Sequence, residues 1–116
     1  MKENIIIEKS KTFALKIIKA YQYLSQNKKE HVMSNQLLRA ATSIGANIYE
    51  AVRGVSKPDF YNKMNIALKE ANETDYWLEL LCESNYLGKT MFDELYYDCQ
   101  ELIKILVAIT KTQKNE

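Results

Sequence analysis

Residues 38–50 read LRAATSIGANIYE, and this stretch decides how the rest of the chain is interpreted. It contains more small residues than an exposed surface helix and more polar residues than a helix buried on all sides. Ile44 and Ile48 lie four residues apart, which places them on one face of a helix. Gly45 and Ala46 have little or no side chain, so another backbone can approach closely there. We therefore predict a helix that packs against more than one neighbour in a bundle.

The composition favours an all-α fold in a single domain spanning residues 1–116. The chain has only 3 Gly and 1 Pro, fewer than a protein of many strands and turns needs. Hydrophobic residues make up 47% and charged residues 27%, which is ordinary for a globular domain and unlike a disordered chain. A length of 116 residues is sufficient to bury a real core.

Periodicity and capping residues predict four helices, at about residues 4–27, 34–53, 57–87 and 91–113. The predicted boundary residues are Ser34 as an N-cap, Gly54 as a left-handed helix end, Ser56 and Thr90 as the first residues of capping boxes, and Gly88 as a stop. Because the connections between these long helices are short, consecutive helices should be antiparallel neighbours. The expected architecture is an antiparallel, up-down-up-down four-helix bundle.

Each predicted helix has one apolar face at helical spacing, which we assign to the core. The assigned residues are Ile6, Phe13, Ile17, Ala20, Tyr21 and Leu24; Leu37, Ala41, Ile44, Ile48, Ala51 and Val52; Phe60, Met64, Ala67, Leu68, Ala71, Leu78 and Cys82; and Phe92, Leu95, Cys99, Leu102, Ile103, Leu106 and Ile109.

Two helices also have a second stripe away from the core face. On the second helix it consists of Arg39, Ser43, Asn47 and Glu50, and on the third of Ile66, Glu70, Glu73, Trp77, Leu80 and Ser84. Large apolar residues mixed with acids suit a subunit interface. The stripe on the second helix has three interpretations: a solvated face, a structural polar network inside the bundle or across a subunit contact, or a ligand or catalytic site.

The antiparallel hairpin places Arg39 at the height of Glu70 and Glu73, so an arginine–carboxylate network is allowed. Whether the two stripes meet within one subunit or between subunits stays open at this stage. If Arg39→Ala leaves one carboxylate buried without its partner, the expected loss of stability is ~3–5 kcal/mol.

The net charge of +1 hides an asymmetry between the two halves of the chain. Residues 1–57 contain ten Lys and Arg against four Asp and Glu, whereas residues 58–116 contain six against eleven. The basic half can face phosphates, or it can pair with the acidic half within one bundle or between subunits. The candidate phosphate contacts are Lys9, Lys11, Lys16, Lys19, Arg53 and Lys57.

No motif for catalysis, cofactor binding or metal binding stands out. The only histidine, His31, falls in a predicted connection without a cysteine or carboxylate cluster beside it. Cys82 and Cys99 fall on core faces, which favours reduced, buried thiols over a disulfide framework. No stretch approaches the ~20 apolar residues of a membrane span, and the N-terminus lacks the features of a signal peptide. We therefore expect a cytoplasmic protein that is not an enzyme, uses no cofactor and does not enter membranes.

The second and third helices carry a resemblance to a known family. The pattern Gln36-x-x-Arg39-Ala40-Ala41-x-Ser43-Ile44-x-x-Asn47-Ile48-x-Glu50 is followed by Ser56-x-x-Asp59-Phe60, Ile66-Ala67 and Glu73. It resembles the bacterial 23S rRNA intervening-sequence proteins, which are encoded within insertions in 23S rRNA genes and also elsewhere. The similarity covers nearly the whole chain and is strongest from Gln36 to Glu73. One departure is Ala51, where the family pattern has Gly.

The resemblance implies a four-helix bundle that assembles as a ring-like homopentamer. A relative, the accessory variability determinant of diversity-generating retroelements, is a basic pentamer that binds nucleic acid and a reverse transcriptase. The present chain differs from that relative because it is nearly neutral.

Together these observations predict a homo-oligomeric binding or adaptor protein associated with RNA, DNA or a nucleic-acid enzyme. The alternative is a protein–protein interaction module that binds no nucleic acid. The residues expected to define the oligomer are Arg39, Ser43, Asn47, Glu50, Glu70, Glu73 and Trp77.

Overall fold

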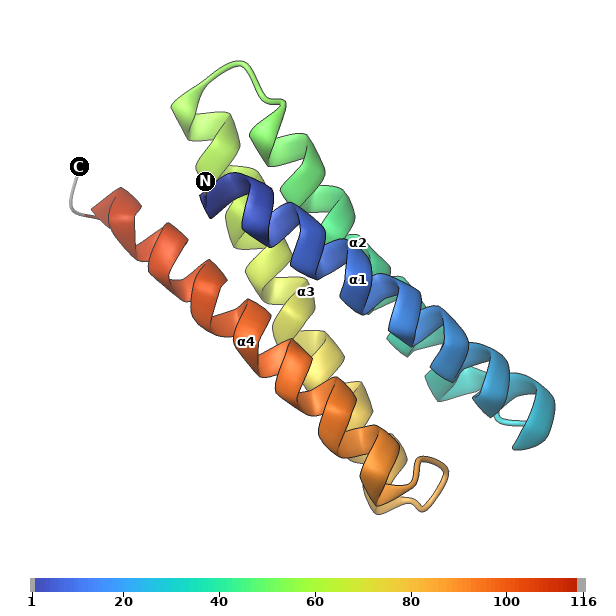
Figure 1. Cartoon of the computed structure of the whole chain (residues 1–116). Coiled ribbons are helices and arrows are strands. Elements are labelled where there is room, and N and C mark those ends of the chain that lie inside the picture. Colours follow the sequence, from blue (N-terminus) through green and yellow to red (C-terminus); the bar gives the residue numbers. More distant parts are fainter. Residues whose placement is uncertain (1, 115–116) are drawn as a thin grey trace.

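The computed structural model of the protein describes residues 2–114, with side chains from residue 5 to residue 113. Its elements are α1 (Lys2–Gln22), which continues into a π-helical turn, η1 (Tyr23–Asn27), then α2 (Val32–Val52), α3 (Lys57–Glu83) and α4 (Lys89–Lys114). Successive helices run in opposite directions (Figure 1), and the bundle measures 46 × 22 × 20 Å. The predicted all-α, up-down-up-down bundle is confirmed, and the described residues contain no strand.

The core lies along the predicted faces of α1, α2 and α4, while α3 is rotated slightly from its predicted face. Tyr61, Thr74 and Leu81 of α3 are buried, whereas Phe60, Leu68 and Cys82 are only partly buried. Thr74 can enter the core because its hydroxyl donates to the Glu70 carbonyl (2.8 Å), which leaves no unsatisfied polar group. A pattern of hydrophobic residues does not identify a buried threonine as part of the core. Tyr21, Val52, Phe92, Ile103 and Ile109 are also partly rather than fully buried.

The start of α2 differs from the prediction. Ser34 is not the N-cap, because the helix begins at Val32 and Ser34 lies buried in its first turn. The cap is the Glu30 carboxylate, which accepts from the amides of Val32 (3.1 Å), Met33 (3.0 Å) and Ser34 (2.7 Å). A carboxylate at a helix N-terminus satisfies free amides and interacts favourably with the helix dipole. The Ser34 hydroxyl donates back to the Glu30 carbonyl at 2.7 Å, so both polar groups are satisfied.

Two of the predicted helix ends are also wrong. Neither Gly54 nor Gly88 has a positive φ, and α3 ends at Glu83 rather than near residue 87. Asn85 takes the left-handed conformation instead, with φ of 69°, which its short polar side chain tolerates better than most. A Cβ atom at Gly54 would come too close to the Asp59 carboxylate, which is the end of a side chain that can shift away.

The two capping-box predictions have opposite outcomes. The Ser56 box is confirmed, since the Ser56 hydroxyl accepts from the Asp59 amide at 3.2 Å. The Thr90 box is wrong, because α4 begins at Lys89 and Thr90 lies inside the helix. Asp93 pairs instead with Lys89, four residues earlier, at 2.6 Å. This pair supports the first turn without a side-chain cap.

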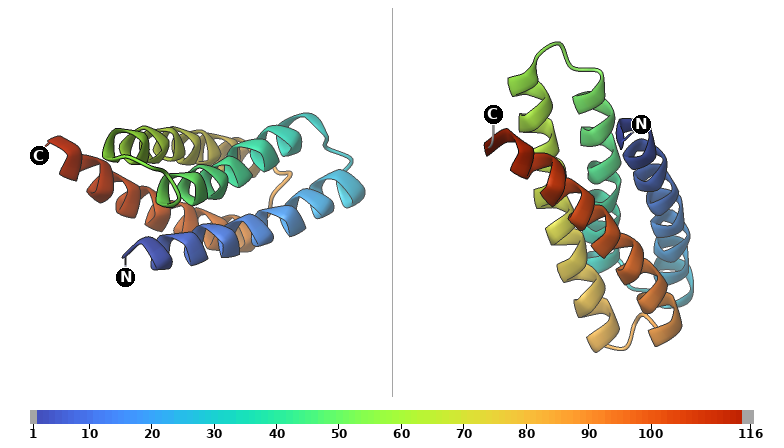
Figure 2. Two further views of the ribbon diagram at one scale, coloured as in Figure 1. Left: turned by 90° about the horizontal axis from the view of Figure 1, so that it is seen from above. Right: turned by 60° about the vertical axis from the view of Figure 1, so that its left-hand side comes forward.

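The stretch 38–50 packs as expected against two neighbours, α1 and α3. Ala40, Ala41, Ile44 and Ile48 are fully buried, and Gly45 faces Ser10 of α1, whose Oγ would lie 3.4 Å from an added Cβ. The α2–α3 contact is the most extensive in the bundle and the α1–α4 contact is the sparsest of the adjacent pairs. Figure 2 shows this openness, with the end of α4 diverging from the start of α1. None of the helices, as far as they are described, is long and apolar enough to cross a bilayer.

Candidate functional site

The predicted stripes of α2 and α3 face each other within one chain. The Arg39 guanidinium donates to Glu70 Oε1 at 3.4 Å and forms a second, closer bond to Glu73. The indole N–H of Trp77 also donates to Glu73 Oε2, at 3.1 Å. The Arg39 side chain is 48% exposed, whereas that of Glu70 is 16% exposed. The network therefore lies at the surface with its carboxylates partly covered by the arginine.

These contacts change the acidity of the groups involved. The pKa of Glu73 is lowered, mainly because the Trp77 indole and then the Arg39 guanidinium bond to its ionised form. The pKa of Arg39 is raised, with the bond to Glu73 as the largest cause. Both side chains are therefore held in their charged forms at neutral pH. An ion network of this kind fixes the positions of its side chains on the surface.

The other predicted members of the α2 stripe do not join this network. The Ser43 hydroxyl donates to the Arg39 carbonyl (2.7 Å), and the Asn47 amide donates to the Ser43 carbonyl (2.8 Å). Glu50 instead pairs with Lys63 of α3 at 3.1 Å. Lys63 was not among the predicted residues, although the antiparallel register that aligns Arg39 with Glu73 also aligns Glu50 with Lys63.

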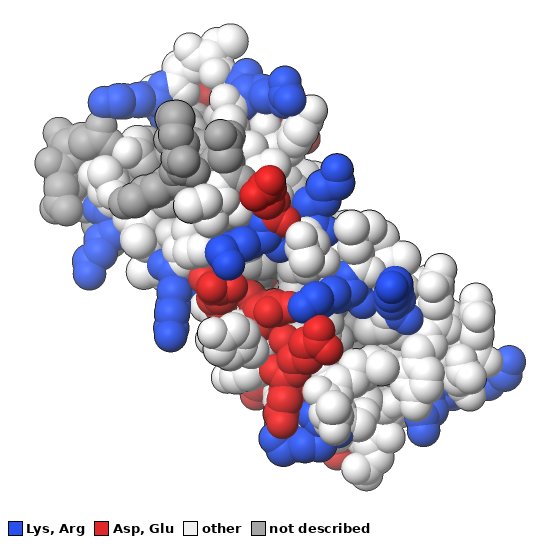
Figure 3. All heavy atoms as spheres, in the orientation of Figure 1, with Lys and Arg blue, Asp and Glu red and all other residues white. Residues whose placement is uncertain are grey.

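Two of the candidate phosphate contacts pair with acids of α4. Lys9 lies 3.2 Å from Glu101, and Lys16 lies 2.8 Å from Asp98 and 2.9 Å from Glu94. The pKa of Lys16 is raised, chiefly by the bonds to Asp98 and then Glu94. Figure 3 shows acidic side chains in a band between α1 and α4, with basic side chains beside them. Pairing of the basic half with the acidic half therefore occurs within the bundle at these positions.

The remaining basic candidates lie elsewhere. Lys11 and Lys19 are exposed on α1 and pair with no acid among the described residues. Arg53 stacks over the Tyr49 ring, with its guanidinium carbon 4.3 Å from the ring centroid. Lys57 is the exposed first residue of α3. The structure thus does not bring the six candidates together into one basic patch.

A group of α3 acids at the α4 side was not anticipated. One oxygen of Asp75 accepts from the Gln100 side-chain amide at 3.1 Å, while the other is buried without a hydrogen-bond partner in the part of the chain described. Protonated Glu79 can donate to Asp75, four residues earlier, and the two carboxylates repel each other when both are charged, so the pKa of Glu79 is raised. The signal available in the sequence was the four-residue spacing of Asp75, Glu79 and Glu83, which places like charges along one side of a helix.

The acids, His31 and the two cysteines are the metal-ligating types of side chain among the described residues. Over the residues described, no three His, Cys, Asp or Glu side chains gather closely enough to hold a metal ion. Burial raises the pKa of the Cys99 thiol to about 12, so it remains protonated at neutral pH. Cys82 is partly exposed, and both thiols are free.

The fold and these contacts define a class: an all-α, up-down-up-down bundle whose surface carries charged networks between neighbouring helices. The sequence model of the 23S rRNA-intervening sequence proteins matches residues 2–108. The chain belongs to this family, as its resemblance predicted.

A solved structure supports the same assignment. It is a protein of unknown function from the S23 ribosomal protein family of Bacteroides thetaiotaomicron VPI-5482. The two chains are 50% identical, the alignment covers 96% of this chain and 99% of that one, and the TM-score is 0.93. A comparison with curated proteins found no match.

Proposed function

We propose that this protein is a non-enzymatic, homo-oligomeric adaptor of the cytoplasm that works in association with RNA. The observation that carries the proposal is the surface network of Arg39, Glu70, Glu73 and Trp77, whose charged groups are already held by one another. Such a surface suits recognition, because its side chains are pre-organised and need little ordering on binding. Partly buried Ile66 and Leu80 on the same α3 stripe add apolar contact area.

Self-association is the first part of the proposal. A cytoplasmic adaptor of 13.5 kDa gains reach and multivalency by assembling, and the resemblance implies a homopentamer. Light scattering on the purified protein should give an oligomeric mass over a concentration series. A mass of one chain at every concentration would contradict this part of the proposal.

RNA association is the second part, and Lys11 and Lys19 are its best-placed contacts. Both are exposed, both lie on α1, and neither is neutralised by a described acid. Binding of single-stranded RNA by these side chains should weaken as salt rises, with a slope of log K against log salt of about −0.7 per phosphate contact.

The matched experiment measures RNA binding across a salt series for wild type, Lys11→Glu/Lys19→Glu, and the control Lys69→Glu, which changes an exposed lysine of α3. The double variant should lose affinity and show a shallower slope, while the control stays within twofold of wild type. Equal losses for both variants would indicate a non-specific charge effect and would reject the assignment to α1.

A second candidate function is a protein-binding adaptor that contacts no nucleic acid. The specific observation in its favour is that Lys9 and Lys16 are engaged with Glu101, Glu94 and Asp98, which reduces the positive charge available to phosphates. It predicts no RNA binding at low salt and partner binding that nuclease treatment leaves unchanged.

A further inference from the structure

An apolar groove opens where the C-terminal half of α4 diverges from the start of α1 (Figure 1). Its volume is about 610 Å³. The lining residues are Ile5, Phe60, Tyr61, Lys104, Ile105, Ala108, Ile109 and Thr112. Among the described lining residues Lys104 alone is charged, and it pairs with no described acid. We call this feature the Lys104 groove.

A complementary surface lies elsewhere on the same chain. Asp75, Glu79 and Glu83 follow one another at four-residue intervals on α3, and none has a cationic partner within the described chain. Most other described acids are paired with a lysine or arginine or sit at a helix start. Tyr76, beside Glu79, is 56% exposed. We call Asp75, Tyr76, Glu79 and Glu83 the acidic strip of α3.

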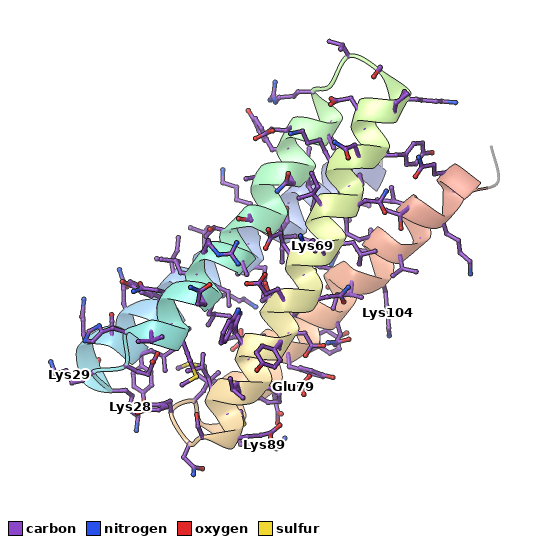
Figure 4. All side chains as sticks on the ribbon, turned by 180° about the vertical axis from the view of Figure 1, so that it is seen from behind. Lys28, Lys29, Lys69, Glu79, Lys89 and Lys104 are labelled. Atoms are coloured by element: carbon purple, nitrogen blue, oxygen red, sulfur yellow. The ribbon has the colours of Figure 1, made fainter. Side chains whose placement is uncertain are left out.

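The groove and the strip cannot satisfy each other within one subunit. The bond between Gln100 and Asp75 sets the register of α4 against α3, and this register places Lys104 well away from Glu79 along the bundle. Figure 4 shows the two labelled side chains on different helices and at different heights. Each surface therefore has a charge without a partner and an apolar component that remains partly exposed.

We propose that the acidic strip of α3 in one copy of the chain docks into the Lys104 groove of a second copy. In this arrangement Glu79 meets Lys104, and Tyr76 lies against the apolar lining of the groove. The proposal rests on the self-association put forward above and names the two surfaces that would make it.

Charge and geometry both favour this occupant. A cation beside Glu79 would offset its repulsion from Asp75, the same repulsion that raises the pKa of Glu79. More than half of the Tyr76 surface is still exposed and can add apolar contact area, and half-exposed Val107 of α4 extends the apolar area near Lys104. Because the two surfaces differ, the contact is head-to-tail, and repetition of it closes a ring when the rotation between subunits permits.

Charge exchange tests the contact directly. Sedimentation or light scattering would compare wild type with Lys104→Glu, Glu79→Lys and the double variant Lys104→Glu/Glu79→Lys. Each single variant should weaken association at least tenfold, because like charges then face each other. The double variant restores opposite charges and should recover the wild-type mass. Lys28→Glu changes an exposed lysine of the connection before α2, outside both surfaces and the Arg39 network, and should assemble as wild type does.

A steric variant gives an independent readout. Ala108 lines the groove and is exposed, so Ala108→Trp should fill the groove without disturbing the core. It should lose association, and adding Glu79→Lys should not restore it. Circular dichroism would verify that every variant retains wild-type helicity.

The outcomes separate this contact from self-association itself. An oligomeric wild type whose mass is unaffected by Lys104→Glu, Glu79→Lys and Ala108→Trp would overturn the contact and leave self-association standing. Loss of assembly in the single charge variants without recovery in the double variant would also overturn it. A wild type that is monomeric at all concentrations would overturn both proposals.

Discussion

The α2–α3 and α1–α4 contacts both carry opposite charges, yet they are built differently. Between α2 and α3 the helices pack extensively, with Ala41 and Ala67 in the core, and the ion network lies at the surface above buried apolar side chains. Between α1 and α4 the contact is sparse, and a cleft of about 360 Å³ remains beside the pairs made by Lys9 and Lys16. At the α2–α3 contact the ion pairs fix the register of helices that are already well packed. At the α1–α4 contact, where packing is sparse, the ion pairs supply much of the contact.

The largest expected difference comes from the packed contact itself. Ile48→Ala on α2 removes a fully buried side chain and should destabilise the protein by ~2–5 kcal/mol, because a cavity remains. Ile18→Ala on α1, where the side chain is 37% exposed, is the matched control and should cost under about 1 kcal/mol. Urea denaturation measures both. Similar losses would show that α2 has no special role in the core.

The ion network of α2 and α3 should have the next largest effect. Arg39→Ala leaves Glu70 and Glu73 without their cation. Because Arg39 is half exposed, the expected loss of stability is roughly 1–2 kcal/mol, less than the loss for a buried carboxylate. Thermal unfolding of Arg39→Ala and Arg39→Lys would test this. Lysine should restore only part of the loss, because it cannot reproduce the two-pronged contact with both carboxylates. An unchanged melting temperature for Arg39→Ala would contradict a structural role for the network.

The α1–α4 pairs should show a smaller and more salt-sensitive effect. Lys16→Ala removes the contacts with Glu94 and Asp98 and should cost under about 1 kcal/mol, because all three side chains are partly exposed. In about 1 M salt the difference from wild type should nearly vanish, since screening weakens exposed pairs. Arg39→Ala serves as the reference and should keep more of its effect in salt. Equal salt sensitivity would remove the distinction between the two contacts.

The smallest effect concerns pH and separates two acids of α3. Folding raises the pKa of Glu79 above its ordinary value of 4.5, so protonated Glu79 stabilises the folded protein. This stabilisation is present below pH 4.5 and is lost as the pH rises through the raised pKa. Glu79→Gln should therefore raise the melting temperature slightly at pH 7 and leave it unchanged near pH 4. Glu73 has a lowered pKa, so its contribution is present at neutral pH and disappears as the pH falls below 4.5. Glu73→Gln should accordingly lower the melting temperature at pH 7, and equal shifts for both variants would contradict these assignments.

Part of the candidate site could be predicted from the sequence, because it depends on the spacing of residues along two neighbouring helices. The facing of Arg39 and Glu73 follows from helical periodicity and a short connection between two antiparallel helices. The partners of Lys9 and Lys16 were not predictable in the same way. They are acids of α4, 78 to 92 residues away along the chain, and pairing depends on how α1 and α4 are rotated about their axes.

What the sequence by itself determined was the all-α bundle, most of its core faces and its membership of the 23S rRNA-intervening sequence family. These properties follow from apolar residues repeating at helical spacing, which is local information. Tertiary structure alone decided that Lys9 and Lys16 of α1 pair with acids of α4, and that Asp75 of α3 accepts a hydrogen bond from Gln100 of α4. Each of these depends on where a side chain ends in space, and packing between helices sets that position.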